Sequence, residues 1–162
     1  IDAIVRVHID SWIAQFTPFL SAQQVLLKEL DEGKQIKLWQ ARFATEEGIS
    51  RKTFVAEQHN QVIAYITGRD SDGIADAELH QIYVQTNKHR LGIGRRLVAE
   101  LAKNYHHRGK KSLFVWVMTI NPAVTFYRDS LGGDYVTERL IADGDGILRE
   151  AAYCWQSLEE LF

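Results

Sequence analysis

The sequence predicts a mixed α/β (α+β) domain in which helices cover both faces of a central sheet. Apolar residues recur with helical spacing up to Phe43, and from Thr53 they follow strand-like patterns that two further helical segments interrupt. Early helices followed by strands with two crossing helices are typical of a mixed sheet between helical layers. A chain of 162 residues has the size of one domain with one core, so we expect residues 1–162 to form a single domain.

Three helical segments are expected before the first strand. Residues 1–12 place their apolar side chains on one helical face. Residues 21–30 begin with serine and carry glutamine three positions later, which is a capping-box pattern, and Gly33 is expected to end that helix. Residues 36–43 indicate another helical turn or two.

The later apolar patterns predict strands. A tight turn at 59–61 joins the first two, and the almost continuous apolar run 113–118 is typical of a strand buried on both faces. The last two strands flank a turn at 143–146 and form a hairpin. Strands are expected at residues 53–58, 62–68, 77–84, 113–118, 135–142 and 147–155.

Two helices are expected between these strands. Residues 94–108 carry a strongly apolar face, and Gly109 is a good stop signal. Asn121, followed by proline, predicts the start of a short helix that ends at residues 131–133. The tail to Phe162 is expected to form one loose helical turn.

Composition narrows the function classes. A net charge of −2 offers no polybasic surface for nucleic acid, and the locally clustered basic residues favour a small anionic ligand. No apolar stretch approaches the roughly 20 residues that span a bilayer, and no signal peptide is visible, so no membrane partner is expected. Cys154 is the only cysteine, which excludes an internal disulfide and fits a reducing, cytoplasmic location. The six histidines lack zinc-like spacing, so no metal is expected.

The most informative segment covers residues 78–96. An apolar strand leads into the basic loop 88–90 and then into Gly92 and Gly94 at the start of a helix. Exposed N–H groups and the positive end of the helix dipole make such a turn a place to hold a phosphate. A dinucleotide-binding turn needs a third glycine where Leu97 stands, and a P-loop needs Gly-Lys-Ser/Thr where this chain has Gly-Arg-Arg. Acyl-coenzyme A is the third interpretation.

The run 82–94 resembles motif A of the GNAT N-acetyltransferase superfamily, whose loop is written Q/R-x-x-G-x-G/A. His89 stands at the Gln/Arg position, and Gly92 and Gly94 fill both glycine positions. Arg90 stands where many members carry glycine. Because backbone N–H groups hold most of the pyrophosphate in this family, both departures should cost little, and basic side chains add ion pairing to phosphate.

A second segment supports the same resemblance. Residues 121–127, followed by 131–133, are similar to motif B of the superfamily. The Asn-to-Tyr spacing is one residue shorter than in many members, and glycine replaces a common aromatic residue at the last position. Segments near both ends, 12–20 and 152–155, resemble one bacterial branch of these enzymes. The resemblance covers nearly the whole chain, and the family's first strand would precede Ile1.

The resemblance implies a GNAT acyltransferase fold with a mixed, mostly antiparallel sheet, and acetyl-coenzyme A as cosubstrate. The pantetheine arm would lie along the strand that ends near Val84, and the loop amides would hold the pyrophosphate. Lys88, Arg90 and Arg95 are candidates for the outer phosphates. The implied cofactor-binding residues are Ile82, Tyr83, Val84, His89, Arg90, Leu91, Gly92, Ile93, Gly94, Arg95 and Asn121.

The reaction implied by the resemblance is direct acetyl transfer to an amine in a ternary complex. The amine arrives as an ammonium and must lose a proton, for which Glu78, acting through water, is the first candidate base and His80 the second. A backbone N–H near Ile82 or Tyr83 would stabilise the oxyanion. Tyr127 stands at the position of the family's general acid, and a phenol stays protonated at neutral pH.

Other interpretations stay open at this point. Glu78 could be a strand-edge carboxylate paired with a lysine, Tyr127 could be a core side chain, and Cys154 is most often an inert buried thiol. The acceptor could be a polyamine, an amino sugar, an amino acid derivative or a protein amine. A homodimer is expected by family habit only. The rival to an enzyme is a non-catalytic module that binds acyl-coenzyme A on the same fold.

Overall fold

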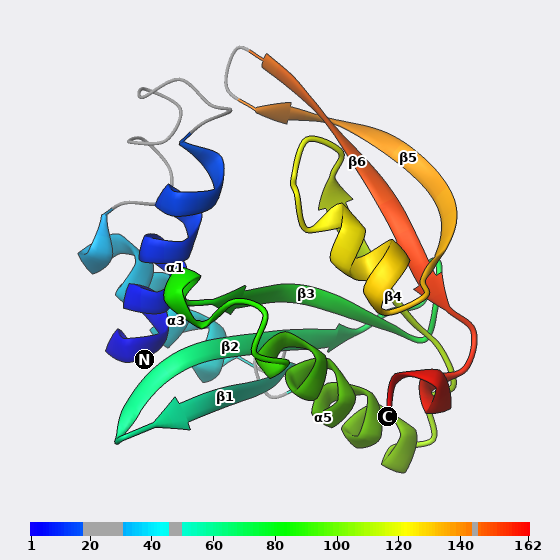
Figure 1. Ribbon diagram of the computed structural model, residues 1–162, viewed down its shortest axis with the longest axis horizontal. Coiled ribbons are helices and arrows are strands. Elements are labelled where there is room, and N and C mark those ends of the chain that lie inside the picture. The colour runs from blue at the N-terminus through cyan, green and yellow to red at the C-terminus, as the bar shows by residue number, and fades with distance from the viewer. Residues whose placement is uncertain (18–30, 46–49, 144–145) are drawn as a thin grey trace.

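The computed structural model describes residues 1–17, 31–45, 50–143 and 146–162 (Figure 1). The predicted helix at 21–30 therefore lies outside the described residues. None of the described helices is long and apolar enough to cross a membrane.

A six-stranded mixed sheet forms the centre of the fold, with the order β1-β2-β3-β4-β6-β5. Every neighbouring pair is antiparallel except β3 and β4, which are parallel. The expected mixed, mostly antiparallel sheet is therefore confirmed. The strands are β1 (Lys52–Gln58), β2 (Gln61–Asp70), β3 (Ala77–Val84), β4 (Leu113–Met118), β5 (Asp134–Asp143) and β6 (Gly146–Trp155).

Helices cover both faces of the first three strands. On β2, Tyr65 packs against Trp39 of α3 (Glu32–Ala44) and belongs to one core cluster with α1 (Asp2–Phe16). Ile66 points the other way and packs in the main core with α5 (Ile93–His107). Because side chains alternate along a strand, these two clusters lie on opposite faces of the sheet. Figure 1 shows α1 and α3 together at the left and α5 below β1 and β2.

The start of α3 differs from the prediction. Asp31 is its N-cap, and the Asp31 side chain accepts a hydrogen bond of 2.9 Å from the Lys34 N–H. A cap of this type satisfies one of the free donors of the first turn. Gly33 therefore lies inside the first turn of α3 and does not end a helix, because the aspartate two residues earlier already starts a new one.

The two halves of the sheet separate between β3 and β4. Pairing covers only three residue pairs, from Ala77 with Leu113 to Leu79 with Val115. Beyond Leu79, β3 has no partner on that side within the described chain. Figure 1 shows β6 and β3 diverging from the region of β4, with the short helix that follows β4 lying in the angle between them. The separation leaves a gap bordered by the second half of β3.

The segment after β4 is less regular than expected. Asn121 Oδ1 accepts a hydrogen bond of 2.7 Å from the Ala123 N–H, as predicted for a cap. The following helix ends in the π-helical turn η2 (Phe126–Ser130), in which the Leu131 N–H donates to Phe126 O. After it, a Cβ on Gly133 would lie 2.9 Å from Trp155 Cζ2. The Trp155 indole thus packs directly against Gly133 and leaves no space for a larger side chain there.

The chain ends close to α5. The final turn η3 (Leu158–Leu161) confirms the expected helical tail, and Leu158 and Leu161 are buried in the main core.

Candidate functional site

The loop between β3 and α5 presents a run of unused backbone donors. The His89 N–H donates to Thr86 O at 3.3 Å, and the Arg96 N–H donates to Gly92 O at 3.1 Å. Between these two bonds, no N–H group from Arg90 to Arg95 donates to a described residue. The first N–H groups of any helix lack an intrahelical acceptor, and here they add to the positive end of the α5 dipole. The six donors form a site suited to an anion.

Two left-handed residues shape this loop. Gly92 has φ 76° and is the N-cap of α5, and a Cβ at Gly92 would meet nothing within 4 Å. Glycine is thus required there for its backbone angle and not for space within the free protein. Arg90 has φ 63°, a left-handed backbone angle that costs an arginine more than it would cost a glycine. A Cβ on Gly94 would lie 3.3 Å from Phe126 Cζ, so this glycine allows η2 to approach α5.

Some basic side chains of the loop make hydrogen bonds within the protein, and Arg90 makes none with a described residue. Lys88 Nζ donates to Gln58 Oε1 at 2.8 Å, and the Arg95 guanidinium donates to Ser130 O. His89 Nε2 donates to Val84 O at 2.8 Å, so its ring turns back to the end of β3. Arg90 is exposed and contacts no described partner. Of the predicted phosphate contacts, Arg90 is therefore the cation that needs no rearrangement.

The second half of β3 faces the gap with part of its backbone. The Gln85 N–H donates to Ile63 O, so the alternate pairing pattern directs the Tyr83 peptide groups to β2 and those of Ile82 and Val84 to the gap. Val84 O already accepts bonds from His89 and from Ser11 Oγ at 3.3 Å. The Ile82 groups and the Val84 N–H remain as edge positions beside which an extended amide chain can lie. The three predicted residues thus differ in role, because only two of them turn their peptide groups outward.

A buried carboxylate lies where the gap begins. Glu78 is the middle residue of the three that pair with β4, and its side chain is only 8% exposed. Arg69 on β2 donates from Nε and Nη2 to Glu78 Oε2, both at 2.7 Å. His80 Nδ1 lies 3.4 Å from Glu78 Oε1. Burial on its own would raise the pKa of Glu78, but the hydrogen bonds from His80 and Arg69, with the charge of Arg69, hold that pKa below its ordinary value.

A bulge in β3 brings His80 to this position. The register with β2 shifts between Thr67 and Gly68, which pair with Gln81 and Leu79, so His80 is the extra residue. His80 is also the first residue beyond the last β3–β4 pair. Its side chain is 25% exposed, in contrast to that of Glu78.

Tyr127 lies on η2 and is buried in the main core. Burial raises the pKa of its hydroxyl, so the phenol is protonated over the whole physiological range. That hydroxyl makes no hydrogen bond with a described residue. Asn121, in contrast, is engaged, because its Oδ1 accepts from the Ala123 N–H and from Gln15 Nε2 of α1.

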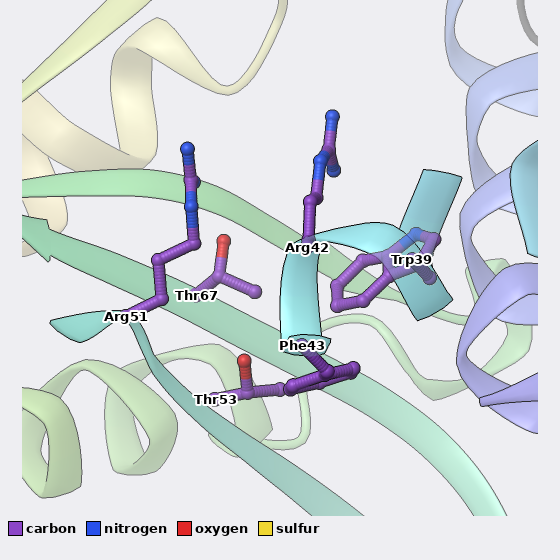
Figure 2. Close-up of a pocket in the computed structure, with 6 residues that line it drawn as sticks. All are labelled: Trp39, Arg42, Phe43, Arg51, Thr53 and Thr67. Atoms are coloured by element: carbon purple, nitrogen blue, oxygen red, sulfur yellow. The ribbon is translucent and has the colours of Figure 1, made fainter. Parts of the chain in front are cut away.

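Two concave regions lie apart from the glycine turn. Figure 2 shows the first, which is lined by Trp39 and Phe43 of α3 and by Thr53 and Thr67 of β1 and β2, and its volume of about 10 Å³ has room for one water molecule. The second, of about 410 Å³, lies between His106 and Glu159 at the other end of α5. A 15-residue helix is about 22 Å long, so this groove is remote from Gly92. In the described part of the chain, no group of three or more His, Cys, Asp or Glu side chains could hold a metal ion.

Sequence reasoning missed Arg69. It expected a lysine as the alternative partner of Glu78, whereas the β2–β3 register pairs Arg69 with Glu78. If the pairing of Thr67 with Gln81 continued without a bulge, Arg69 would lie opposite Leu79, and the one-residue shift that pairs it with Glu78 cannot be read from apolar alternation. Ser11 was missed because nothing local in α1 indicates a contact with Val84.

Comparison with known proteins agrees with this geometry. The acetyltransferase (GNAT) family matches residues 12–132. A Bacillus subtilis (strain 168) protein named "Uncharacterized N-acetyltransferase YuaI" is 29% identical over 98% of this chain and 88% of its own length.

Two solved structures share the fold. The PaiA N-acetyltransferase from Thermoplasma acidophilum, in complex with coenzyme A, has a TM-score of 0.63 at 19% identity and covers 92% of this chain and 90% of its own. An N-acetyltransferase from Staphylococcus aureus Mu50 has a TM-score of 0.69 at 17% identity and covers 97% and 92%. The fold and the turn define an acyltransferase of this architecture, and the family match covers most of the chain. The protein belongs to the GNAT acetyltransferase family.

Proposed function

We propose that the protein is an N-acetyltransferase that moves the acetyl group of acetyl-coenzyme A to a primary amine by direct transfer in a ternary complex. The observation that carries the proposal is the run of six N–H groups from Arg90 to Arg95 that have no acceptor among the described residues, at the start of α5 and beside an open β3 edge. The acceptor is a polyamine, an amino sugar, an amino acid derivative or a protein amine. We also expect the protein to act in the cytoplasm and to form a homodimer.

The cofactor is oriented by backbone on two sides. The pyrophosphate accepts hydrogen bonds from the loop amides, and Arg90 pairs with an outer phosphate. The pantetheine arm extends along β3, donates to the Ile82 carbonyl and accepts from the Val84 N–H, as an added strand would, which leaves the Ile82 N–H for the reacting carbonyl. This arrangement carries the thioester to the region of His80, where β3 and β4 begin to separate.

The chain supplies groups for each step of the transfer. The pair formed by Glu78 and His80 removes a proton from the ammonium, and the amine then attacks the thioester carbonyl. The Ile82 N–H stabilises the oxyanion. Tyr127 donates a hydrogen bond to the sulfur as the C–S bond breaks. Because its pKa is raised, the phenol stays protonated and acts as a hydrogen-bond donor, not as a strong acid. Holding both substrates together supplies much of the acceleration.

A pair of glycine substitutions tests the cofactor site. Gly92→Ala and Gly109→Ala both place a Cβ at a positive φ, 76° and 81°, with nothing within 4 Å. The strain, about 1 kcal/mol, is therefore matched, but only Gly92 borders the free amides. Calorimetry with coenzyme A is expected to show at least about tenfold weaker binding for Gly92→Ala and unchanged binding for Gly109→Ala. Equal affinities for both variants would refute the site.

Activity is tested separately by thiol release from acetyl-coenzyme A with polyamines, aminoglycosides and short peptides. Release with at least one amine is expected. Tight coenzyme A binding without release from any amine would favour the rival, a binding module without catalysis.

A further inference from the structure

Arg69, Glu78 and His80 form a connected row across the β2–β3 register shift. Both Glu78 oxygens are engaged, Oε2 by two guanidinium nitrogens at 2.7 Å and Oε1 by His80 Nδ1 at 3.4 Å. The three side chains also differ in depth, because Glu78 is 8% exposed while Arg69 and His80 are 37% and 25% exposed. The carboxylate is therefore the enclosed middle member, and an incoming amine meets the imidazole or the guanidinium first.

Glu78 is poorly suited to take a proton from a substrate. A carboxylate held by a two-nitrogen arginine contact is stabilised in its charged form, and protonation would give up much of that contact. Its lowered pKa agrees with this geometry. A base works best when its pKa lies near the working pH, and this environment moves Glu78 away from that range.

His80 has the position that Glu78 lacks. The bulge makes it the first residue beyond the β3–β4 pairs, so it lies at the start of the gap. When Nδ1–H donates to Glu78, the imidazole keeps an unprotonated Nε2, and that atom has no hydrogen-bond partner among the described residues.

We infer that His80 Nε2 is the general base of this enzyme, and that Glu78 and Arg69 are positioning residues that fix the imidazole tautomer. The inference rests on the proposed function and deepens it. The contact of 3.4 Å between His80 and Glu78 is long, as catalytic hydrogen bonds often are before substrate binds.

Acetyl transfer takes two protons from the ammonium nitrogen. The ammonium gives one proton to His80 Nε2, and the amine nitrogen then forms a C–N bond to the thioester carbonyl carbon as the carbonyl π pair moves onto oxygen. That pair returns, the C–S bond breaks, and its electrons leave on sulfur. The nitrogen then loses a second proton, and the departing thiolate takes up one proton, so the two changes cancel. Tyr127 donates a hydrogen bond to the sulfur during this step. His80 returns its proton to solvent.

The electrostatic surroundings of the pair are simple among the described residues. On β4, Phe114 pairs with Glu78 in the sheet, and that strand carries no charged side chain. Arg69 is the charged neighbour in contact with Glu78. Further charged or titratable groups on neighbouring segments include Asp76 before β3, Lys52 on β1, Arg51, Asp70 with its partner Arg108, His8 bonded to Tyr65, Arg42 over Trp39, and Tyr105 on the far face.

Four variants and one control test the inference. Each is assayed for thiol release across pH with acetyl-coenzyme A and the best amine from the polyamine, aminoglycoside and peptide panel. His80→Gln, with His80→Asn as a second variant, is expected to lower kcat about 100-fold with unchanged coenzyme A affinity. His107→Gln, an exposed histidine on α5, is the control and is expected to match the wild type.

The other two variants are expected to move the pH profile in opposite directions. Glu78→Gln removes a negative charge beside the imidazole, so the limb of kcat/KM governed by the base is expected to move to lower pH. Arg69→Met removes a positive charge, so the limb moves to higher pH. A purely structural role for either residue would lower activity without these opposite shifts.

Nitrogen NMR of the wild-type histidines gives an independent readout, with the proton of His80 expected on Nδ1. Three results together would overturn the inference and leave the proposed function standing. Turnover would be lost in Glu78→Gln, it would be kept in His80→Gln, and the base-dependent limb of the pH profile would lie below about pH 5. Absence of turnover in the wild type with every amine would overturn both.

Discussion

The Tyr127 hydroxyl has two properties that suit a hydrogen-bond donor to a bound ligand. Burial raises its pKa, and yet it has no hydrogen-bond partner among the described residues. The hydroxyl oxygen does not belong to the fully buried side-chain atoms that lack a partner, so it keeps contact with solvent and can meet a partner that arrives with the cofactor. The sulfur of a thioester substrate is such a partner.

Tyr127→Phe removes this donor and keeps the ring in the core. We expect kcat to fall by about 10- to 100-fold, because a hydrogen bond to the developing thiolate is lost, while the affinity for coenzyme A stays the same. Stability should change little, since no hydrogen bond within the described protein is broken. Steady-state kinetics with calorimetry separate the two effects. A fall in affinity with unchanged kcat would assign Tyr127 to binding alone.

The packing of α5 on the sheet depends on one glycine of β2. A Cβ at Gly68 would lie 2.8 Å from the Tyr105 hydroxyl oxygen and 2.9 Å from Leu101 Cδ1. Both neighbours are buried in α5, so neither can move away cheaply. This contact sets how closely the helix lies on the strands, and with it the position of the amides at the start of α5.

Gly68→Ala tests this contact. We expect a loss of about 1–3 kcal/mol in the free energy of unfolding, because the added methyl overpacks a filled interface. Gly73→Ala is the matched control, since its nearest contact is Ser71 Oγ at 3.5 Å, and its stability should stay within about 0.5 kcal/mol of the wild type. Urea unfolding of both variants measures the difference. Equal stabilities would mean that the interface can relax.

Most elements could be predicted because their signals are local. The apolar run 113–118 and the strand 77–84 match β4 and β3, and the apolar face of 94–108 matches α5. The site could be predicted only in part. The glycine turn is local and was found, whereas the pairing of Arg69 with Glu78 depends on register between strands, which local patterns do not contain. The engaged state of Asn121 depends on Gln15, which lies 106 positions away in sequence.

Two carboxylates, Asp76 and Glu78, lie where β3 and β4 join the two halves of the sheet, and their charge affects the stability of the whole molecule. Asp76 Oδ2 accepts from the Lys111 N–H at 2.7 Å, which ties the start of β3 to the start of β4. This backbone hydrogen bond is the main reason why the pKa of Asp76 lies below its ordinary value of 3.8. Glu78 lies two residues further along the same strand with a pKa below its ordinary 4.5.

The sign of the pH dependence follows from these lowered values. A carboxyl with a lower pKa in the folded state adds stability above its unfolded value and loses it as pH falls through the folded value. We therefore expect the free energy of unfolding to stay constant from pH 7 to about pH 5 and to decrease below about pH 5. Asp76→Asn should be less stable than the wild type at pH 7, and the difference should shrink towards pH 3.

Urea unfolding at several pH values checks this expectation. Asp72→Asn, an exposed residue in the β2–β3 turn, serves as the control for the loss of a charge. A difference between wild type and Asp76→Asn that stays constant with pH would mean that the Asp76 charge does not hold the two strands together.

We propose that the amides at the start of α5, which have no acceptor among the described residues, bind the diphosphate of coenzyme A. A titration of the ¹⁵N-labelled protein with coenzyme A, followed through the backbone amide signals, tests it most directly. We predict that the largest shifts fall on Arg90 to Arg95, followed by Ile82 and Val84 on the β3 edge. Unchanged signals there, with shifts gathered around His106 and Glu159 at the far end of α5, would contradict the account.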